Sequence, residues 1–385
     1  MSEQSHQAGT GPAGGTKRVG SGELFFDLVF VVAVTQVSTL LQHDHGWAGL
    51  LRALVVFVPV YWTWVGAAVL TNQRDASRPG LRITLFAVAL AAVFMALALP
   101  QAYGERGLLF ALSYWTGRVL LGSGLLRRAA RTRRLPANPY TVAMFVTGPL
   151  LVVGALTEGT VRELIWACAA VGDLSSSTVL RSRLASMHMD PEHLAERFGL
   201  FVLIALGESV VAIGASAQSA GQLSVGVGAA VAAAFVLACG LWWTYFHFAA
   251  DAFVHSLSTA KVQGDITRFV LSYGHLAFIA AIIVVAVGMH DAVAHPADHL
   301  PWGVAGLLFG GSALYLATFG FTRWAMFRQV STTRLSAAGV VVAVLPVAGY
   351  VPALVSLVVL AVVVAGVNVV ELMLVRRRSR SISAT

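Results

Sequence analysis

Five ionisable side chains lie inside long apolar stretches of this chain, and they are its first candidates for chemistry. They are Asp27, Arg118, Asp173, Glu208 and His275. A charge at the centre of a lipid bilayer costs at least about 2.5 to 3.5 kcal/mol, so each of these side chains needs a partner, water or a function. We expect the five to converge as a buried polar cluster, which would be a candidate proton or substrate site.

Charge balance gives this predicted cluster its chemistry. Three carboxyl groups share one fixed positive charge, that of Arg118. At least one carboxyl must then hold a proton at neutral pH unless a cation is bound, which is typical of a proton relay. Glu208 is the most diagnostic residue, because long apolar flanks leave its carboxyl no route to water. An ion pair with Arg118, proton or cation handling, and acid–base catalysis all remain open for Glu208.

A second polar group is expected at the cytoplasmic mouth of this site, and it consists of Glu23, His193, Glu196 and Arg197. Glu23 and Asp27 are one helical turn apart and therefore share a helix face. Arg197 and Glu208 are about three turns apart and also share a face. Asp-Pro at 190–191 is a helix start signal. A line of charge is thus predicted to run from the mouth into the membrane.

Aromatic residues are expected to line an apolar cavity beside this cluster. They are Trp62, Trp64, Trp243 and Tyr245. Rings of this kind could stabilise a cationic intermediate by cation–π contact, as an enzyme acting on a lipid or isoprenoid would require. Simple packing between helices is the alternative for each of them.

Motifs of soluble enzymes are missing from the sequence. It contains no phosphate-binding loop, no dinucleotide fingerprint after a strand and no serine nucleophile elbow. We therefore expect no catalytic residue of those types and no cofactor. Histidines gather at 43–45 and 290–299, but their spacing matches no strong zinc motif, so solvated loops and no metal site are expected.

Twelve hydrophobic stretches position these residues. We predict membrane-spanning helices at 23–41, 47–70, 82–103, 107–126, 139–157, 161–180, 197–217, 224–248, 267–289, 301–323, 334–350 and 352–375. A bilayer core of about 30 Å needs about 20 apolar residues in a helix. The composition agrees, with 57% hydrophobic residues, 11% charged residues and a mean hydropathy of +0.76. The fold class is an all-α integral membrane protein with about twelve transmembrane helices.

Basic residues predict the orientation of these spans. Most of the 26 Lys and Arg fall in alternate loops and at both ends of the chain. Positive charge collects on the cytoplasmic side, so both termini are expected in the cytoplasm and the protein in the cell (plasma) membrane. The net charge of +8 fits contact with anionic membrane lipids. No nucleic-acid motif accompanies the arginines at 127–134. Residues 1–22 and 379–385 are expected to be short cytoplasmic tails, the first of them disordered.

Two parts of the sequence look like copies of one six-helix unit. Val-Tyr-Trp-Thr-Trp at 60–64 resembles Leu-Trp-Trp-Thr-Tyr at 241–245, and Glu-Leu-Phe-Phe at 23–26 resembles Glu-Arg-Phe-Gly at 196–199. Both copies would begin on the same side, which predicts parallel repeats over 23–183 and 184–378. Transporters with parallel repeats bind substrate where the repeats meet. Chance similarity of aromatic-rich apolar helices is the alternative.

Several of these segments resemble the bacterial low temperature requirement protein A family. The resemblance is carried by 23–31 with Gln36, by 196–209, by the tryptophans near 62 and by Ser-Tyr-Gly-His at 272–275. It implies an integral membrane protein linked by its family name to growth at low temperature. It also implies that Glu23, Asp27, Glu196, Arg197 and Glu208 occupy the recognisable positions of the family. The resemblance implies no established substrate and no agreed reaction.

Three functions remain open from the sequence. Twelve spans and buried ionisable residues favour a proton-coupled transporter for an unknown small molecule or ion. Many Gly and Ala residues would suit a non-catalytic membrane protein of stress adaptation, in which buried charge only fixes helix register. A membrane-embedded enzyme acting on a lipid or isoprenoid is the third.

Overall fold

The computed structural model describes residues 18–184 and 188–383. The predicted disordered tail at 1–22 falls outside the described residues up to residue 17, and helix α1 begins at Ser21. Of the predicted tail at 379–385, the last two residues lie outside the described part. Helix α16 runs to Ser383.

Helices make up nearly all of the described chain. The first group is α1 (Ser21–Gln42), α2 (Trp47–Gln73), α3 (Pro79–Ala98), η1 (Leu99–Gln101), α4 (Gly107–Thr132), α5 (Pro139–Val142), η2 (Ala143–Thr147), α6 (Gly148–Ala155), α7 (Gly159–Val179) and α8 (Arg181–Leu184). The second is α9 (Pro191–Ser219), α10 (Val225–Phe246), α11 (Ala250–Thr259), α12 (Gln263–Ile266), η3 (Thr267–Gly274), α13 (His275–Ala294), α14 (Trp302–Phe327), α15 (Thr332–Ala348) and α16 (Ala353–Ser383).

Eight helical segments of the described chain are long and apolar enough to cross a membrane. They are Ser21–Gln42, Trp47–Gln73, Pro79–Gln101, Pro191–Ser219, Val225–Thr259, Gln263–Ala294, Trp302–Phe327 and Ala353–Arg377. The other four predicted spans are helical too, in α4, α5 to α6, α7 and α15. Two of these are short, and α4 and α7 are diluted by polar residues, so length and composition alone support eight crossings rather than twelve.

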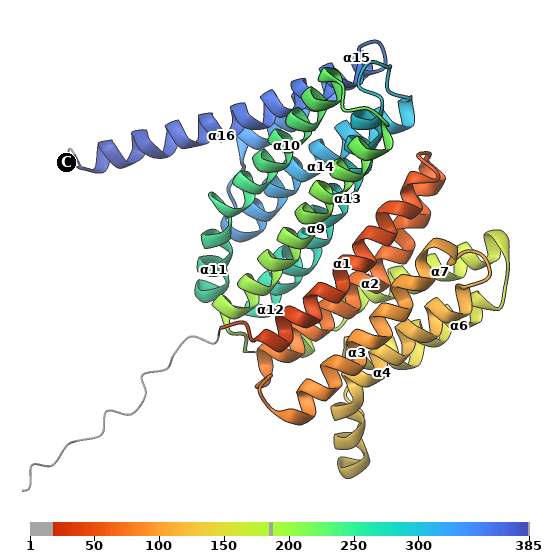
Figure 1. The fold of residues 1–385 in the computed structure, drawn as a ribbon. Helices are drawn as coiled ribbons and strands as arrows, with labels where there is room; N and C mark the ends of the chain where they lie inside the picture. Colours follow the sequence, from red (N-terminus) through yellow and green to blue (C-terminus); the bar gives the residue numbers. More distant parts are fainter. Residues whose placement is uncertain (1–17, 185–187, 384–385) are drawn as a thin grey trace, which may run out of the picture.

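The helices form two groups that lie side by side (Figure 1). Helices α1 to α7, drawn in red to yellow, form one group, and α9 to α16, drawn in green to blue, form the other. Where the groups meet, α1 packs on α9 and α13, and α2 packs on α9. Helix α2 is enclosed on nearly all sides, with 83% of its apolar window buried. The first two helices of the chain therefore make most of the contact between the groups, and Tyr273 of η3 adds a hydrogen bond to the Leu174 carbonyl of α7.

Large apolar side chains cover the outer faces of both groups. Examples are Leu28, Ile83, Leu164, Val211 and Val362, which are each at least 60% exposed. A contiguous apolar surface of this kind is rare on a soluble monomer. Lipid, which is as apolar as these side chains, is the solvent that suits it. The chain is a multi-pass membrane protein on these grounds.

Two helices are interrupted by π-helical turns. Segment η2 separates α5 from α6, and η3 separates α12 from α13. A π turn changes which residues share a helix face, and such turns occur frequently at functional sites. Both interruptions lie beside the polar residues described below.

Close helix packing depends on glycine at the contact of α13 with α14. A Cβ on Gly288 would lie 2.9 Å from the Leu308 Cα atom, which is backbone and cannot give way. We expect Gly288→Ala to lower the free energy of unfolding by about 1 to 3 kcal/mol, the usual range for overpacking. Thermal unfolding in detergent measures this. Gly306→Ala and Gly310→Ala are the controls, because nothing lies within 4 Å of a Cβ at either position. Equal melting temperatures for all three variants would contradict the packing argument.

Candidate functional site

A buried ion-pair network joins the two helix groups at the start of α1 and α9. The Arg197 guanidinium donates through Nη1 to Glu23 Oε1 at 2.8 Å and through Nη2 to Asp27 Oδ1 at 2.6 Å. All three side chains are at most 2% exposed. Since the carboxylates belong to α1 and the guanidinium to α9, the network ties the first group to the second.

His193 extends this network toward the end of α2. Its Nε2 lies 3.2 Å from Glu23 Oε2, and its Nδ1 lies 3.2 Å from Asn72 Nδ2. The Asp190 backbone orients the Asn72 amide, because Asp190 N–H donates to Oδ1 and the Asp190 carbonyl accepts from Nδ2. An amide N–H therefore points at Nδ1, which must accept. His193 is thus neutral, with its proton on Nε2 toward Glu23.

Aromatic side chains close the membrane side of the network. Trp64 Nε1 donates to Asp27 Oδ1 at 2.7 Å. Phe201 stacks on the Trp64 ring with centroids 4.3 Å apart, and the Arg197 guanidinium lies 5.8 Å from a Trp64 ring centroid. Within the described chain, Asp27 Oδ2 is buried without a hydrogen-bond partner. One carboxyl oxygen is therefore left without a hydrogen bond.

Helical spacing explains how the sequence builds this network. Glu23 and Asp27 lie one turn apart, as do His193 and Arg197, so each helix presents two polar groups on one face. Asp190 accepts from the His193 backbone N–H, which confirms the predicted N-cap of α9. Three residues of the predicted mouth come together, namely Glu23, His193 and Arg197. Asp27, which was predicted for the deeper cluster, belongs to the same network. Glu196 does not, because its side chain is exposed on α9.

Asp173 forms a separate group inside the first helix group. Tyr114 donates to Asp173 Oδ2 at 2.5 Å and Thr147 to Oδ1 at 2.7 Å. Arg118 acts on Asp173 only at longer range, through its charge. Its Nη1 donates instead to the Trp62 carbonyl at 2.8 Å. The proposed ion pair between Arg118 and Glu208 is therefore wrong.

Glu208 and His275 also lie apart from the network. Thr35 donates to Glu208 Oε2 at 2.5 Å, across the contact of α1 with α9. His275 Nδ1 lies 3.0 Å from the Val270 carbonyl and so donates, which leaves Nε2 to accept from Tyr245 O–H at 2.6 Å. The five residues predicted to converge are consequently spread over separate polar groups. Sequence patterns show that such residues are buried, but not which helices face them.

The four aromatic residues predicted to line one cavity likewise lie in different parts of the structure. Trp64 belongs to the ion-pair network and Tyr245 to the His275 group. Trp243 is 42% exposed on the outer face. Trp62 lines the cavity described next. Two residues of the predicted outer loops also approach each other across the two helix groups. His45 Nε2 lies 3.6 Å from Asp291 Oδ2.

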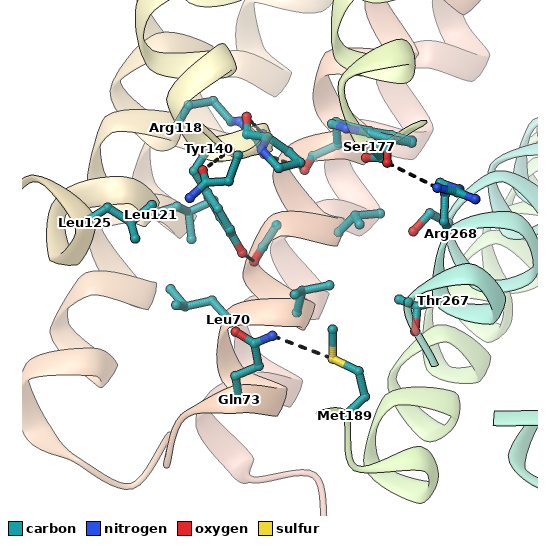
Figure 2. A pocket seen from close by; sticks show the side chains of 18 of the residues that line it. Leu70, Gln73, Arg118, Leu121, Leu125, Tyr140, Ser177, Met189, Thr267 and Arg268 are labelled. Carbon is teal, nitrogen blue, oxygen red and sulfur yellow. Dashed lines mark hydrogen bonds between the residues drawn. The ribbon is translucent and has the colours of Figure 1, made fainter. Parts of the chain in front are cut away.

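The cavity at Trp62 lies between the two helix groups and has a volume of about 170 Å³ (Figure 2). Figure 2 shows Arg118, Tyr140 and Ser177 at one end, Gln73 and Met189 at the other, and Arg268 across from Arg118. Arg268 is not among the predicted site residues, because it lies at the predicted inner end of its helix, where an arginine normally only sets orientation. Its burial in η3 could be seen only once the helices were placed.

Removing the Arg197 guanidinium would leave two carboxylates buried without their cation. We expect Arg197→Gln to lower the free energy of unfolding by roughly 3 to 5 kcal/mol, the usual cost of removing one partner of a buried pair. Arg52→Gln is the matched control: Arg52 pairs with Glu163 at 2.8 Å, but its side chain is 44% exposed. That change should cost less than about 1 kcal/mol. Thermal unfolding in detergent compares them, and equal losses would contradict the assigned role.

Comparison with known proteins places the chain in a family. The family model for the bacterial low temperature requirement A protein (LtrA) matches residues 18–369. A protein of Rhizobium meliloti (strain 1021), described as uncharacterized, is 30% identical over 305 residues, which cover 77% of this chain and 74% of that protein. No solved structure gives a significant match. The chain, with its buried network between α1 and α9, belongs to the bacterial low temperature requirement A protein family.

Proposed function

We propose that the chain is a proton-coupled transporter of the cell membrane, built from two six-helix repeats with both termini in the cytoplasm. The observation that carries the proposal is the Arg197 network, which joins two helix groups through reversible ion pairs. In transporters with parallel repeats, one repeat rocks against the other around a central site. A network of this kind at one end of the contact can hold that end closed.

Helix packing supports the repeat. Under the correspondence of α1 with α9, the same neighbours recur in both groups. The matching pairs are α1–α2 with α9–α10, α1–α3 with α9–α13, α3–α4 with α13–α14, α4–α6 with α14–α15, α6–α7 with α15–α16 and α2–α7 with α10–α16. Chance similarity between apolar helices would not reproduce this order of contacts.

A contact between equivalent positions also supports the repeat. Thr35 and Glu208, which are hydrogen-bonded, are 173 residues apart. Glu23 and Glu196, which begin the similar segments, have the same separation. Two equivalent residues touch each other only where a two-fold axis passes between them. The Thr35–Glu208 contact therefore supports a pseudo-two-fold axis at the α1–α9 contact as part of the proposal.

The free energy of the ion-pair network is consistent with a contact between the helix groups that can open and close. Burying a guanidinium and two carboxylates costs hydration, and their attraction in the dry interior only repays that cost. If the helix groups part, water reaches all the charges and returns the hydration. The closed and open states then differ by far less than the attraction between the charges, so a bound solute can shift the balance.

Charge balance in the network supports proton coupling. Glu23 and Asp27 carry two negative charges against the single positive charge of Arg197, and His193 is held neutral by Asn72. One proton would make the network electroneutral. The buried and unpartnered Asp27 Oδ2 is the proposed position of that proton, since a protonated carboxyl buries no net charge.

Distances between spin labels test the closure. In a background with Cys168 and Cys239 replaced by Ser, labels at Ser77 and Thr259 report on the inner ends of the two groups. Labels at His43 and His299 report on the outer ends. We expect Arg197→Gln to lengthen the inner distance and shorten the outer one, because the inner tie is lost. Arg52→Gln should leave both distances as in the wild type.

The outcome separates two functions. Opposite changes at the two ends support transport by alternating access. Unchanged distances at both ends in folded Arg197→Gln protein would contradict it, and would favour a non-transporting membrane protein of stress adaptation.

Infrared spectroscopy tests the proton site. We expect the purified protein to show the C=O stretching absorption of buried protonated carboxyl groups, and Asp27→Asn to remove one component of it. Glu23→Gln is the control, because both Glu23 oxygens are already occupied by hydrogen bonds from charged or polar groups. Glu208→Gln identifies any separate contribution from the Thr35 contact. A spectrum unchanged by Asp27→Asn would contradict proton binding at Asp27.

A further inference from the structure

We propose that the cavity between the helix groups binds a small organic anion with an apolar body, as the substrate site of the transporter proposed above. The inference rests on that function for its role but on the cavity itself for its chemistry. Three arginines line the cavity, Arg74, Arg118 and Arg268, and its lining contains no Asp or Glu. An apolar cavity with positive charge and no acid selects against cations and favours anions.

Arg118 has buried hydrogen-bonding capacity that the protein does not use. Its side chain is 1% exposed, and within the described residues no carboxylate forms an ion pair with it. Nη1 donates to the Trp62 carbonyl at 2.8 Å, Nη2 lies 3.5 Å from the Pro139 carbonyl, and Nε has no partner. A guanidinium has five N–H donors in a fork that matches a carboxylate or phosphate. An anion in the cavity would supply the missing acceptors.

The opposite wall repeats this arrangement on the second helix group. Arg268 is 5% exposed, and its Nε has no partner among the described residues. Its Nη2 donates to Asp265 at 2.7 Å, but the Asp265 side chain is 52% exposed and directed to the surface. The Thr267 hydroxyl is also buried without a partner and lines the cavity. Both walls therefore present unsatisfied donors to one space.

Gly66 shows that this arrangement needs room. A Cβ on Gly66 would lie 2.8 Å from Arg118 Nη1. A methyl group at residue 66 would push the guanidinium away from its present place beside the Trp62 carbonyl. Arg118 is thus held at the cavity by the backbone of α2, and no ion pair joins it to an acid among the described residues.

Apolar side chains and volume define the rest of the ligand. The cavity is also lined by the apolar side chains of Val65, Val69, Leu70, Leu121 and Leu125. The volume of about 170 Å³ is close to that of engineered cavities of about 150 Å³ that hold one benzene molecule. A single ring or a short hydrocarbon chain carrying one carboxylate fits both the size and the charge.

Binding of benzoate to the full chain in detergent tests the proposal by calorimetry. Arg118→Gln and Arg268→Gln should each weaken benzoate binding by at least about tenfold, since each removes charge-assisted hydrogen bonds. Leu121→Trp should block binding by filling the cavity while leaving both arginines. Arg162→Gln is the matched control, because Arg162 is a buried arginine that binds backbone carbonyls away from the cavity. The Arg162→Gln variant should bind benzoate with the affinity of the wild type.

Ligand controls define the outcomes. Benzyl alcohol and inorganic phosphate should bind much more weakly than benzoate, since one lacks the charge and the other the apolar body. Failure of benzoate to bind, or binding untouched by all three cavity variants, would overturn the proposal. So would binding of short-chain phosphatidic acid at Arg118 without benzoate, which would assign the cavity to a lipid headgroup.

Comparison with the spin-label experiment separates the two proposals. If benzoate binding depends on Arg118 but the distances between the helix groups stay unchanged in Arg197→Gln, the anion site is supported and the transport proposal is contradicted. If the distances change in Arg197→Gln but no anion binds, the transport proposal is supported and the proposed substrate class is contradicted.

Discussion

The cost of burying charge away from water governs how this protein is assembled. Arg197 is inside the helix bundle, so its charge must be compensated by the chain. Glu23 and Asp27 provide that compensation from α1, and Trp64 of α2 fixes Asp27 from the other side. Three helices from two groups are therefore positioned by one guanidinium. Apolar packing, which is similar for any helix rotation in lipid, could not define their relative positions as sharply.

Features that depend on one helix at a time were predictable from the sequence. The length of each apolar stretch located the helices, and the one-turn spacing of Glu23 with Asp27 marked a polar face. The partners of Arg118 and Glu208 were not predictable. They depend on how neighbouring helices are rotated, and Arg118 binds a backbone carbonyl of α2, where its guanidinium passes close to Gly66. Sequence patterns carry no signal for a contact of that kind.

The π turns explain why the cavity was hidden from the sequence. In a regular helix Ser272 shares a face with Arg268, four residues earlier, but not with Thr267, five residues earlier. In η3 the π-helical backbone, with its i to i+5 hydrogen bonds, changes that register, and all three residues line the cavity. On the other wall, α5 leads into η2 and presents Asn138 and Tyr140. Two irregular segments, one in each helix group, thus frame the space between them.

Helix α2 connects the ion-pair network to the cavity. Within one turn, the Tyr61 hydroxyl donates to the Ser272 carbonyl of η3, the Trp62 carbonyl accepts from Arg118, and Trp64 donates to Asp27. A change at Asp27 that moved Trp64 would move the carbonyl to which Arg118 is bound. Coupling between two sites is reciprocal, so an anion that drew Arg118 away from Trp62 would alter the network by the same free energy. In the proposed transporter, this turn is where solute binding and proton binding would influence each other.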